Sequence, residues 1–178
     1  EDMVWQNIFA TTETDVEKLE ELLLDKGDGW GDLAAQRLAL AASKFDADRA
    51  DYQLFLAQYG YTQERVELEM AAEPVGAFPE GTYKVVLSDS PIHGKGLFAT
   101  ADIAAGEPIV LATFNGLRTP AGRYTNHSPN PNAAPVPLDT PDIGLVATRG
   151  IAGSHGGFLG EEITIDYRAA QPFRRVRP

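Results

Sequence analysis

The residues best suited to chemistry are gathered in one stretch, residues 122–132, which reads Gly-Arg-Tyr-Thr-Asn-His-Ser-Pro-Asn-Pro-Asn. It combines amide, imidazole and hydroxyl side chains with two prolines. Each proline fixes its own φ near about −65° and pushes the preceding residue toward extended backbone. Such a segment is a poor helix and a poor central strand, so we predict a shaped, irregular segment that presents polar groups at fixed positions. A surface loop rich in Pro and Asn is the alternative interpretation of this stretch alone.

Two further stretches accompany it: residues 92–99, Ile-His-Gly-Lys-Gly-Leu-Phe-Ala, and residues 160–167, Gly-Glu-Glu-Ile-Thr-Ile-Asp-Tyr. The first is not a phosphate loop, which needs a Gly five residues before its Gly-Lys and a Ser or Thr directly after it. The second carries two adjacent carboxylates, Glu161 and Glu162. Neighbouring residues of a strand point to opposite faces, so these two are not expected to act as an acid/base pair. Ser128 lacks the Gly-x-Ser-x-Gly elbow of many hydrolases.

Composition narrows the chemistry further. The chain has no Cys, which excludes disulfides, thiolate zinc sites and cysteine nucleophiles. Three histidines, His93, His127 and His155, are poor material for a histidine-based metal site, so no metal is expected. Residues 1–75 carry 17 acidic against 6 basic side chains and therefore the whole net charge of −11. Nucleic-acid binding relies on clustered Lys and Arg and is not expected, whereas an acidic surface favours a basic protein or peptide.

The length of 178 residues suits one domain, or one domain with an appendage. No apolar run approaches the roughly 20 residues of a membrane span, and no signal segment is seen. We therefore expect no membrane partner and a cytoplasmic location. The chain begins with Glu1 rather than Met, so we expect that further residues precede it in the natural protein.

Helical periodicity predicts three helices in the acidic region. A capping box, Thr followed three residues later by Glu, opens the first over residues 14–26. Apolar residues recur at three- and four-residue steps over residues 32–60, which predicts one long helix or two with a break at residues 46–48. Thr62 can cap a third helix, which must finish before Pro74. We interpret the aromatic and leucine side chains as the inner faces of a small helical bundle.

A different pattern follows. Closely spaced Pro and Gly predict a linker, after which short β-type runs are separated by turn residues. The predicted strands are residues 83–87, 96–99, 108–113, 143–147 and 163–167. We therefore predict an α+β chain with these parts: an acidic helical region over residues 1–75, a linker over 76–82, a β-rich domain over 83–170 and a basic tail over 171–178.

Taken together and in this order, the three stretches resemble motifs of the SET-domain protein lysine methyltransferases. That family has a His-Gly-x-Gly-type turn, an Arg-Phe/Tyr-x-Asn-His-Ser-x-x-Pro-Asn segment and a Gly-Glu-Glu-Leu/Ile-Thr-x-Asp-Tyr segment. The resemblance covers about residues 83–168, and its last two motifs are specific. It implies the SET fold, a β-clip of small sheets in which the C-terminal segment passes the Asn-His-Ser segment as a pseudoknot.

The resemblance also implies roles for individual residues. The cofactor would be S-adenosylmethionine. The turn whose backbone would receive its methionine end is formed by Gly94, Lys95, Gly96 and Leu97. The residues that would line the rest of the cofactor pocket are Arg123, Asn126 and His127. Tyr167 would be the active-site tyrosine, with its hydroxyl where the target lysine meets the methyl group.

The implied reaction is an in-line methyl transfer from a sulfonium to a neutral amine. The enzyme must desolvate and align the lysine and lower its pKa below about 10.4. Burial beside a positive sulfonium does this, and backbone carbonyls and a Tyr hydroxyl can orient the amine. A strong base is then unnecessary, which agrees with the lack of an Asp/His dyad in the sequence pattern.

The sequence departs from the family pattern in several places. Pro129 replaces the Cys that usually follows Asn-His-Ser, and the zinc-binding cysteines that follow many SET domains are missing. Only residues 114–122 stand where the family inserts a helical segment that forms one wall of both grooves. Residues 152–159 lengthen the turn before the last strand. We predict that the N-terminal helices replace the missing wall, and that either such a helix or Phe173 with the tail closes the lysine channel.

Three hypotheses follow from the sequence. The first is a transferase that methylates the side-chain amine of a lysine in a basic protein or peptide. The second is a catalytically silent SET-fold module that binds a protein partner through its acidic helices. The third is methylation of an amine that is not part of a protein.

Overall fold

The computed structural model describes residues 30–78, 80–155 and 159–173. Within them the chain is a mixed α+β protein, with a helical N-terminal part followed by several small sheets, as the sequence pattern predicts. The helix expected over residues 14–26 lies outside the described residues. The chain divides into two compact units, Glu1–Ala41 and Ala42–Pro178, and every contact discussed below lies within the second.

The helical part contains two described helices. Helix α2 (Trp30–Tyr59) is continuous, so the alternative of a break at residues 46–48 is wrong. Helix α3 (Gln63–Ala72) confirms the predicted cap, because Thr62 Oγ1 accepts a hydrogen bond from the Arg65 amide at 3.3 Å. No helix in the described part of the chain is long and apolar enough to cross a lipid bilayer.

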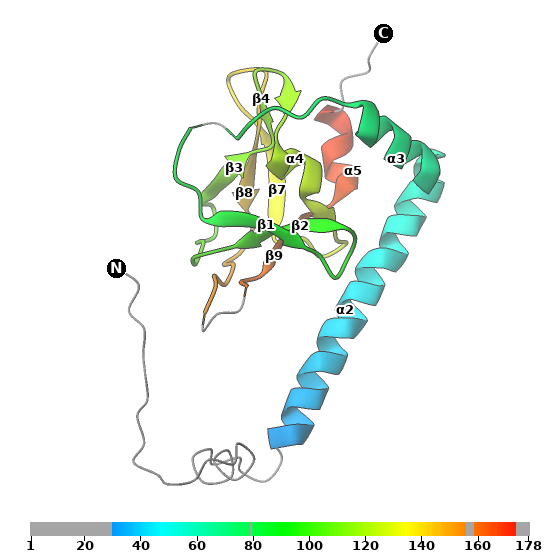
Figure 1. Ribbon diagram of the computed structural model, residues 1–178, viewed down its shortest axis with the longest axis vertical. Helices are drawn as coiled ribbons and strands as arrows, with labels where there is room; N and C mark the ends of the chain where they lie inside the picture. The colour runs from blue at the N-terminus through cyan, green and yellow to red at the C-terminus, as the bar shows by residue number, and fades with distance from the viewer. Residues whose placement is uncertain (1–29, 79, 156–158, 174–178) are drawn as a thin grey trace, which may run out of the picture. The chain divides into compact units, whose positions relative to one another are not determined.

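The first sheet carries all three sequence motifs. Its four strands are β1 (Val85–Asp89), β2 (Lys95–Ala99), β9 (Glu162–Ile165) and β6 (Asn126–His127), in that order across the sheet. The pairs β1–β2 and β2–β9 are antiparallel, and Figure 1 shows these three strands together. Strands β6 and β9 are parallel. Strand β9 therefore lies between strands that come from the other two motifs.

The remaining elements form two smaller groups and three short helices. A three-stranded antiparallel sheet has the order β3 (Pro108–Leu111), β8 (Ile143–Ala147) and β7 (Ala133–Pro137). A hairpin joins β4 (Thr113–Phe114) to β5 (Leu117–Arg118). The short helices are α4 (Pro120–Tyr124), α5 (Tyr167–Ala170) and the 3₁₀ turn η1 (Gln171–Phe173).

The hairpin turn between β4 and β5 needs left-handed backbone at two successive residues. Asn115 has a φ of 51° and Gly116 a φ of 75°. Asn and Gly tolerate this region best, and two such residues form the turn that matches the twist of a hairpin. Asp142 fixes this turn, since its two carboxylate oxygens accept hydrogen bonds from both amides at 3.1 Å.

The stretch over residues 122–132 is more regular than its composition predicts. Its first residues belong to α4, which is capped by Thr119, and Asn126 and His127 lie in β6. Strand β7 was not predicted because it contains two prolines, and it tolerates them as an edge strand. The last predicted strand ends at Ile165, because Asp166 caps α5 by accepting a hydrogen bond from the Arg168 amide at 2.9 Å.

The core of the second unit lies between the two larger sheets. Its largest fully buried apolar side chains are Leu97 on β2, Ile163 on β9 and Leu145 on β8, each at most 1% exposed. Burying one such side chain contributes about 1.5–3 kcal/mol. Two of the three motif strands are thus fixed by core packing on one face, and their polar side chains are left to occupy the other.

The aromatic residues of α2 do not form the inside of a helical bundle. Phe55 is 5% exposed, and its ring lies 5.9 Å from that of His127 and 5.6 Å from that of Tyr167. No residue of α3 is buried. Within the described residues, the buried face of α2 therefore packs on the motif segments of the β-rich part.

Candidate functional site

Pairing of adjacent strands brings the three motifs together. Asn126 and His127 of β6 stand opposite Thr164 and Ile165 of β9. On the other side of β9, Leu97 stands opposite Ile163. The adjacent strands of a sheet lie about 4.8 Å apart, so side chains from all three motifs reach one another.

The Asn126 side chain links the turn at residues 93–95 to β6 and β9. Its amide nitrogen lies 3.2 Å from the His93 carbonyl, 3.1 Å from the Lys95 carbonyl and 2.7 Å from Glu162 Oε1. It also lies 3.0 Å from Ser90 Oγ. The amide nitrogen has only two hydrogens for these four acceptors, so its N–H groups are fully engaged within the protein.

The two adjacent glutamates serve different surroundings, as the alternation along a strand predicts. Burial raises the pKa of Glu162, although Asn126 and Ser90 donate hydrogen bonds to its carboxylate. Glu161 is also partly buried, but hydrogen bonds from Arg149 and the Ala152 amide hold its pKa below the usual range. The pair has no shared site and is not an acid/base pair.

The turn at residues 94–97, here called the glycine turn, has open space at Gly94 but not at Gly96. Gly94 has a φ of 53°, and a Cβ added to it would meet nothing within 4 Å. A Cβ on Gly96 would collide with the Glu162 carboxylate and lie 3.0 Å from Ser90 Cβ, so a side chain there would require Glu162 to move. The side chain of Lys95 points to Asp89, with Nζ and Oδ1 2.9 Å apart, and Leu97 lies in the core.

Arg123 holds the C-terminal end of α3. Its guanidinium donates to the carbonyl of Met70 and, at 2.7 Å, to the carbonyl of Glu73. The last carbonyls of a helix have no intrahelical partner, and a guanidinium there satisfies them and opposes the helix dipole. The Nε atom of Arg123 is buried and has no hydrogen-bond partner within the described residues.

His127 is held in one tautomer. Its ring is 2% exposed, and Nδ1 accepts a hydrogen bond from the Tyr167 amide at 3.1 Å. The proton of the neutral ring therefore sits on Nε2, which donates to Asp51 Oδ2 at 2.8 Å. The imidazole joins two motifs to α2 and turns no free nitrogen toward a ligand.

Asp51 receives a second, stronger partner from the residue that follows the last motif. Arg168 Nη1 donates to Asp51 Oδ2 at 2.6 Å. Hydrogen bonds from Arg168 and then from His127 hold the pKa of Asp51 below its usual range. One turn earlier, Asp48 is 2% exposed, and its Oδ1 accepts a 2.6 Å hydrogen bond from Ser128 Oγ. We call Asp48 and Asp51, with these three partners, the acidic clamp.

Tyr167 completes the arrangement. Its hydroxyl donates to the carbonyl of Thr125 at 3.0 Å, and its ring packs against those of His127, Phe55 and Tyr52. Burial raises the pKa of the Tyr167 hydroxyl, so it is a neutral donor and acceptor at physiological pH. The phenolic oxygen of Tyr167 and the backbone oxygen of Thr125 are thus two neutral oxygens that lie side by side. Thr125 is the residue directly before Asn126 in the chain.

The sequence did not reveal the residues of α2 that meet the motifs. They lie on one face of the helix at positions 48, 51, 52 and 55, a spacing of three and four residues. Carboxylates on a helix face are normally solvated, so the sequence alone predicts an exposed acidic surface. The only available signal was the mixture of acidic and aromatic residues on a single face, which is unusual for a helix that packs on other helices.

No group of three or more His, Asp or Glu side chains could hold a metal ion in the part of the chain that the structure describes. No protein-family model matches the sequence, and no curated protein matches it with significance.

Proposed function

We propose that this protein is a SET-type methyltransferase that transfers a methyl group from S-adenosylmethionine to the side-chain amine of a lysine in a basic protein or peptide. The SET fold is part of the proposal. It is supported by the position of β9 between β2 and β6. It is also supported by Asn132, whose side chain both donates a hydrogen bond to the backbone of β9 and accepts one from it. The Asn132 amide donates to the Glu162 carbonyl, and its Oδ1 accepts from the Thr164 amide, each at 2.8 Å.

The single observation that carries the proposal is the 3.0 Å contact between the Tyr167 hydroxyl and the Thr125 carbonyl. These oxygens come from the two most specific motifs, and Thr125 directly precedes Asn126, whose amide nitrogen contacts the turn expected to receive the cofactor. An amine can donate to both, and neither oxygen protonates near neutral pH. Such a pair orients an amine lone pair for in-line attack without acting as a strong base.

The chain also offers groups that fit the cofactor. S-adenosylmethionine would supply an electrophilic methyl group and a positive charge. The open side of Gly94 leaves room for close backbone approach, and the unpartnered Nε–H of Arg123 can donate to a carboxylate. The amide nitrogen of Asn126 would act through the backbone it holds, because it is already engaged. His127 would likewise position Tyr167 rather than touch the cofactor.

Helix α3 is the proposed replacement for the missing wall. Where the family inserts a helical segment, this chain has only the β4–β5 hairpin and the five residues of α4. Arg123, at the end of α4, reaches across to the last carbonyls of α3. The first turn of α3 also approaches the glycine turn, with Gln63 Nε2 3.5 Å from His93 Nε2.

The silent binding module stays the second candidate. The Asn126 amide nitrogen and both ring nitrogens of His127 favour it, because all three are engaged without any ligand. A purely structural role would explain these two residues equally well. It would not explain the orphan Nε of Arg123.

Calorimetric titration with S-adenosylmethionine and S-adenosylhomocysteine tests the proposal. Gly94→Phe should abolish binding because the new ring fills the open side of the turn. Gly106→Phe is the matched control, since Gly106 also has a positive φ, 81°, and also has open space around it. Binding by wild type and the control but not by Gly94→Phe is the expected result. No binding by the wild type would reject the enzyme and favour the silent module.

A further inference from the structure

We propose that Tyr52 of helix α2 forms the second wall of the site that holds the target amine. The proposal rests on the methyltransferase function and adds to it a residue outside all three motifs. Tyr52 lies more than thirty residues before the region that resembles the family. Its part in the site comes from the packing of α2 on the motif strands.

The acidic clamp fixes the position of Tyr52. Asp51, its neighbour, is bound by both His127 and Arg168, and Asp48 one turn earlier is bound by Ser128. Two partners from the motif at residues 122–132, together with Arg168 just after the last motif, thus determine the height and rotation of this part of the helix. Position 52 cannot turn away from the site without breaking at least one of these contacts.

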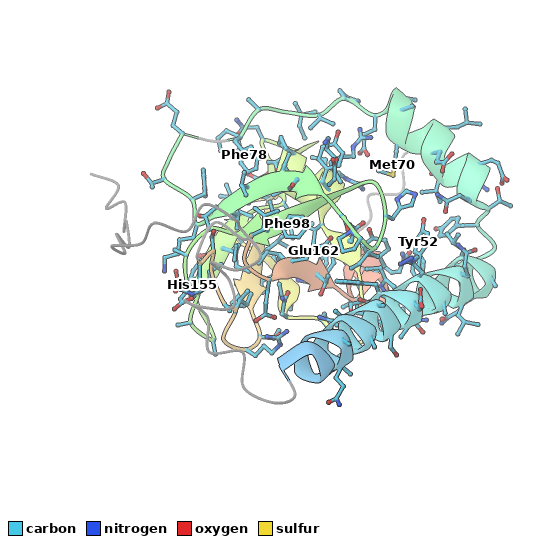
Figure 2. All side chains as sticks on the ribbon, turned by 60° about the horizontal axis from the view of Figure 1, so that its bottom comes forward. Tyr52, Met70, Phe78, Phe98, His155 and Glu162 are labelled. Atoms are coloured by element: carbon cyan, nitrogen blue, oxygen red, sulfur yellow. The ribbon has the colours of Figure 1, made fainter. Side chains whose placement is uncertain are left out.

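The Tyr52 ring meets the proposed active-site tyrosine edge to face. The ring centroids of Tyr52 and Tyr167 are 5.9 Å apart and their planes differ by 86°. Figure 2 shows Tyr52 projecting from α2 toward the β-rich part. This geometry is favourable for two aromatic rings, and it forms a corner of two perpendicular aromatic surfaces.

Tyr52 is the aromatic residue of α2 in contact with Tyr167 that keeps access to solvent. Phe55 also contacts Tyr167, but it is 5% exposed and has the Arg168 guanidinium 6.0 Å from its ring centre. Tyr52 is half-buried, and its hydroxyl forms no hydrogen bond with any residue that the structure describes. A half-buried phenol without a partner is available to a ligand.

The chemistry of this corner suits a lysine side chain. Aromatic faces pack on the methylenes and attract an ammonium group. Burial raises the pKa of Tyr52, as does the nearby carboxylate of Glu67, so its hydroxyl stays neutral and can accept an N–H. Glu67 is exposed on α3 and draws a cation toward the corner. The amine would then meet three oxygens: those of Tyr52, Tyr167 and Thr125.

The direct test is NMR of protein labelled with ¹³Cζ-tyrosine, titrated with n-butylamine as a mimic of the lysine side chain in the presence of S-adenosylhomocysteine. Tyr52→Phe and Tyr167→Phe assign the two resonances by their loss. We expect both resonances to shift with the same apparent affinity. Tyr83, which packs on Phe78 with 5.7 Å between ring centroids, is the internal control and should not shift.

The outcomes separate the two proposals. A shift of Tyr167 with an unmoved Tyr52 would overturn the role of Tyr52 and leave the proposed function intact. No shift of either residue would overturn both. A uniform shift of all tyrosines, Tyr83 included, would indicate unspecific binding of the amine and would also reject the role of Tyr52.

Kinetics on a mixture of Lys/Arg-rich peptides provides an independent readout. Tyr52→Leu should raise KM for the peptides about tenfold while the Kd for S-adenosylmethionine stays unchanged, because uniform binding of the amine is lost. Tyr52→Phe should recover most of the loss by restoring the ring. Tyr59→Leu, at an exposed position one turn of helix beyond Phe55, is the control. Equal KM values for wild type and Tyr52→Leu would contradict the proposal.

Discussion

Helices α2 and α3 meet the same motif strands in opposite ways. Helix α2 buries Asp48, Phe55 and Leu56 and is fixed by the acidic clamp. Helix α3 buries no residue and is held at its C-terminal end by the guanidinium of Arg123. The difference indicates that α2 is a permanent part of the folded unit, whereas α3 can detach at low cost.

The largest effect is expected at the aromatic contact of α2. Phe55→Ala should lower the free energy of unfolding by about 3–4 kcal/mol, because it leaves a cavity between His127 and Tyr167. Its neighbour Leu54 is 64% exposed, so Leu54→Ala should cost less than about 0.5 kcal/mol. Urea denaturation measures both. Similar losses for the two variants would mean that α2 is not packed as described.

The ion pair of α2 is expected to have the next largest effect. Asp51→Asn should destabilise the fold by about 2 kcal/mol, since Arg168 and His127 lose a charged acceptor. The folded pKa of Asp51 is depressed, so its contribution is fully present above the unfolded pKa of 3.8 and is lost as the pH falls through the folded value. Wild type and variant should therefore converge in acid. Asp46→Asn, at a 75% exposed side chain, serves as the control.

Loosening α3 should have a smaller and local effect. Arg123→Met removes the donors to the Met70 and Glu73 carbonyls and should cost about 1 kcal/mol. Hydrogen exchange should accelerate over residues 63–72 and stay unchanged over residues 48–59. Arg65→Met breaks only a surface pair with Glu69 and should leave both segments unchanged. Equal acceleration of hydrogen exchange in both helices would contradict the claim that α3 is held less firmly than α2.

The smallest effect concerns the two adjacent glutamates. The test is whether replacing each one changes the free energy of unfolding in opposite directions. The folded pKa of Glu162 is raised by burial, so ionisation favours the unfolded chain and stability falls as the pH rises from the unfolded pKa through the folded one. Glu162→Gln should therefore be neutral or stabilising at pH 7. Glu161→Gln should be destabilising, because Glu161 has a depressed pKa and pairs with Arg149 at 2.7 Å. Thermal unfolding at pH 7 compares the two variants with the wild type. A destabilisation of both variants, or a stabilisation of both, would contradict the opposite pKa shifts of the two glutamates.

The contrast between the helices also marks what could be predicted from sequence. The cap and the length of α3 were predictable, because a capping Thr and a following Pro are local signals. The short strands were predictable from alternation and Gly or Pro punctuation. The different surroundings of Glu161 and Glu162 agree with the expected alternation along a strand, although Glu161 lies just before β9.

The clamp could not be predicted, because its partners are distant in the sequence. Asp51 lies 76 residues before His127 and 117 before Arg168. A single sequence gives no measure of such pairing, and an acidic residue on a helix is normally solvated. The regular backbone at Asn126 and His127 was missed for a related reason: amide and imidazole side chains favour loops unless buried partners satisfy them, as Glu162 and Asp51 do here.

The central claim is that the Tyr167 hydroxyl and its carbonyl partner orient an amine for methyl transfer. Transfer of a labelled methyl group from S-adenosylmethionine to a mixture of basic proteins, by wild type and by Tyr167→Phe, tests it most directly. The variant loses one hydrogen bond to Thr125 and about 1 kcal/mol of stability, so it should stay folded. We predict that its transfer rate falls about 100-fold. Equal incorporation by the two proteins, with folding verified for both, would contradict the claim.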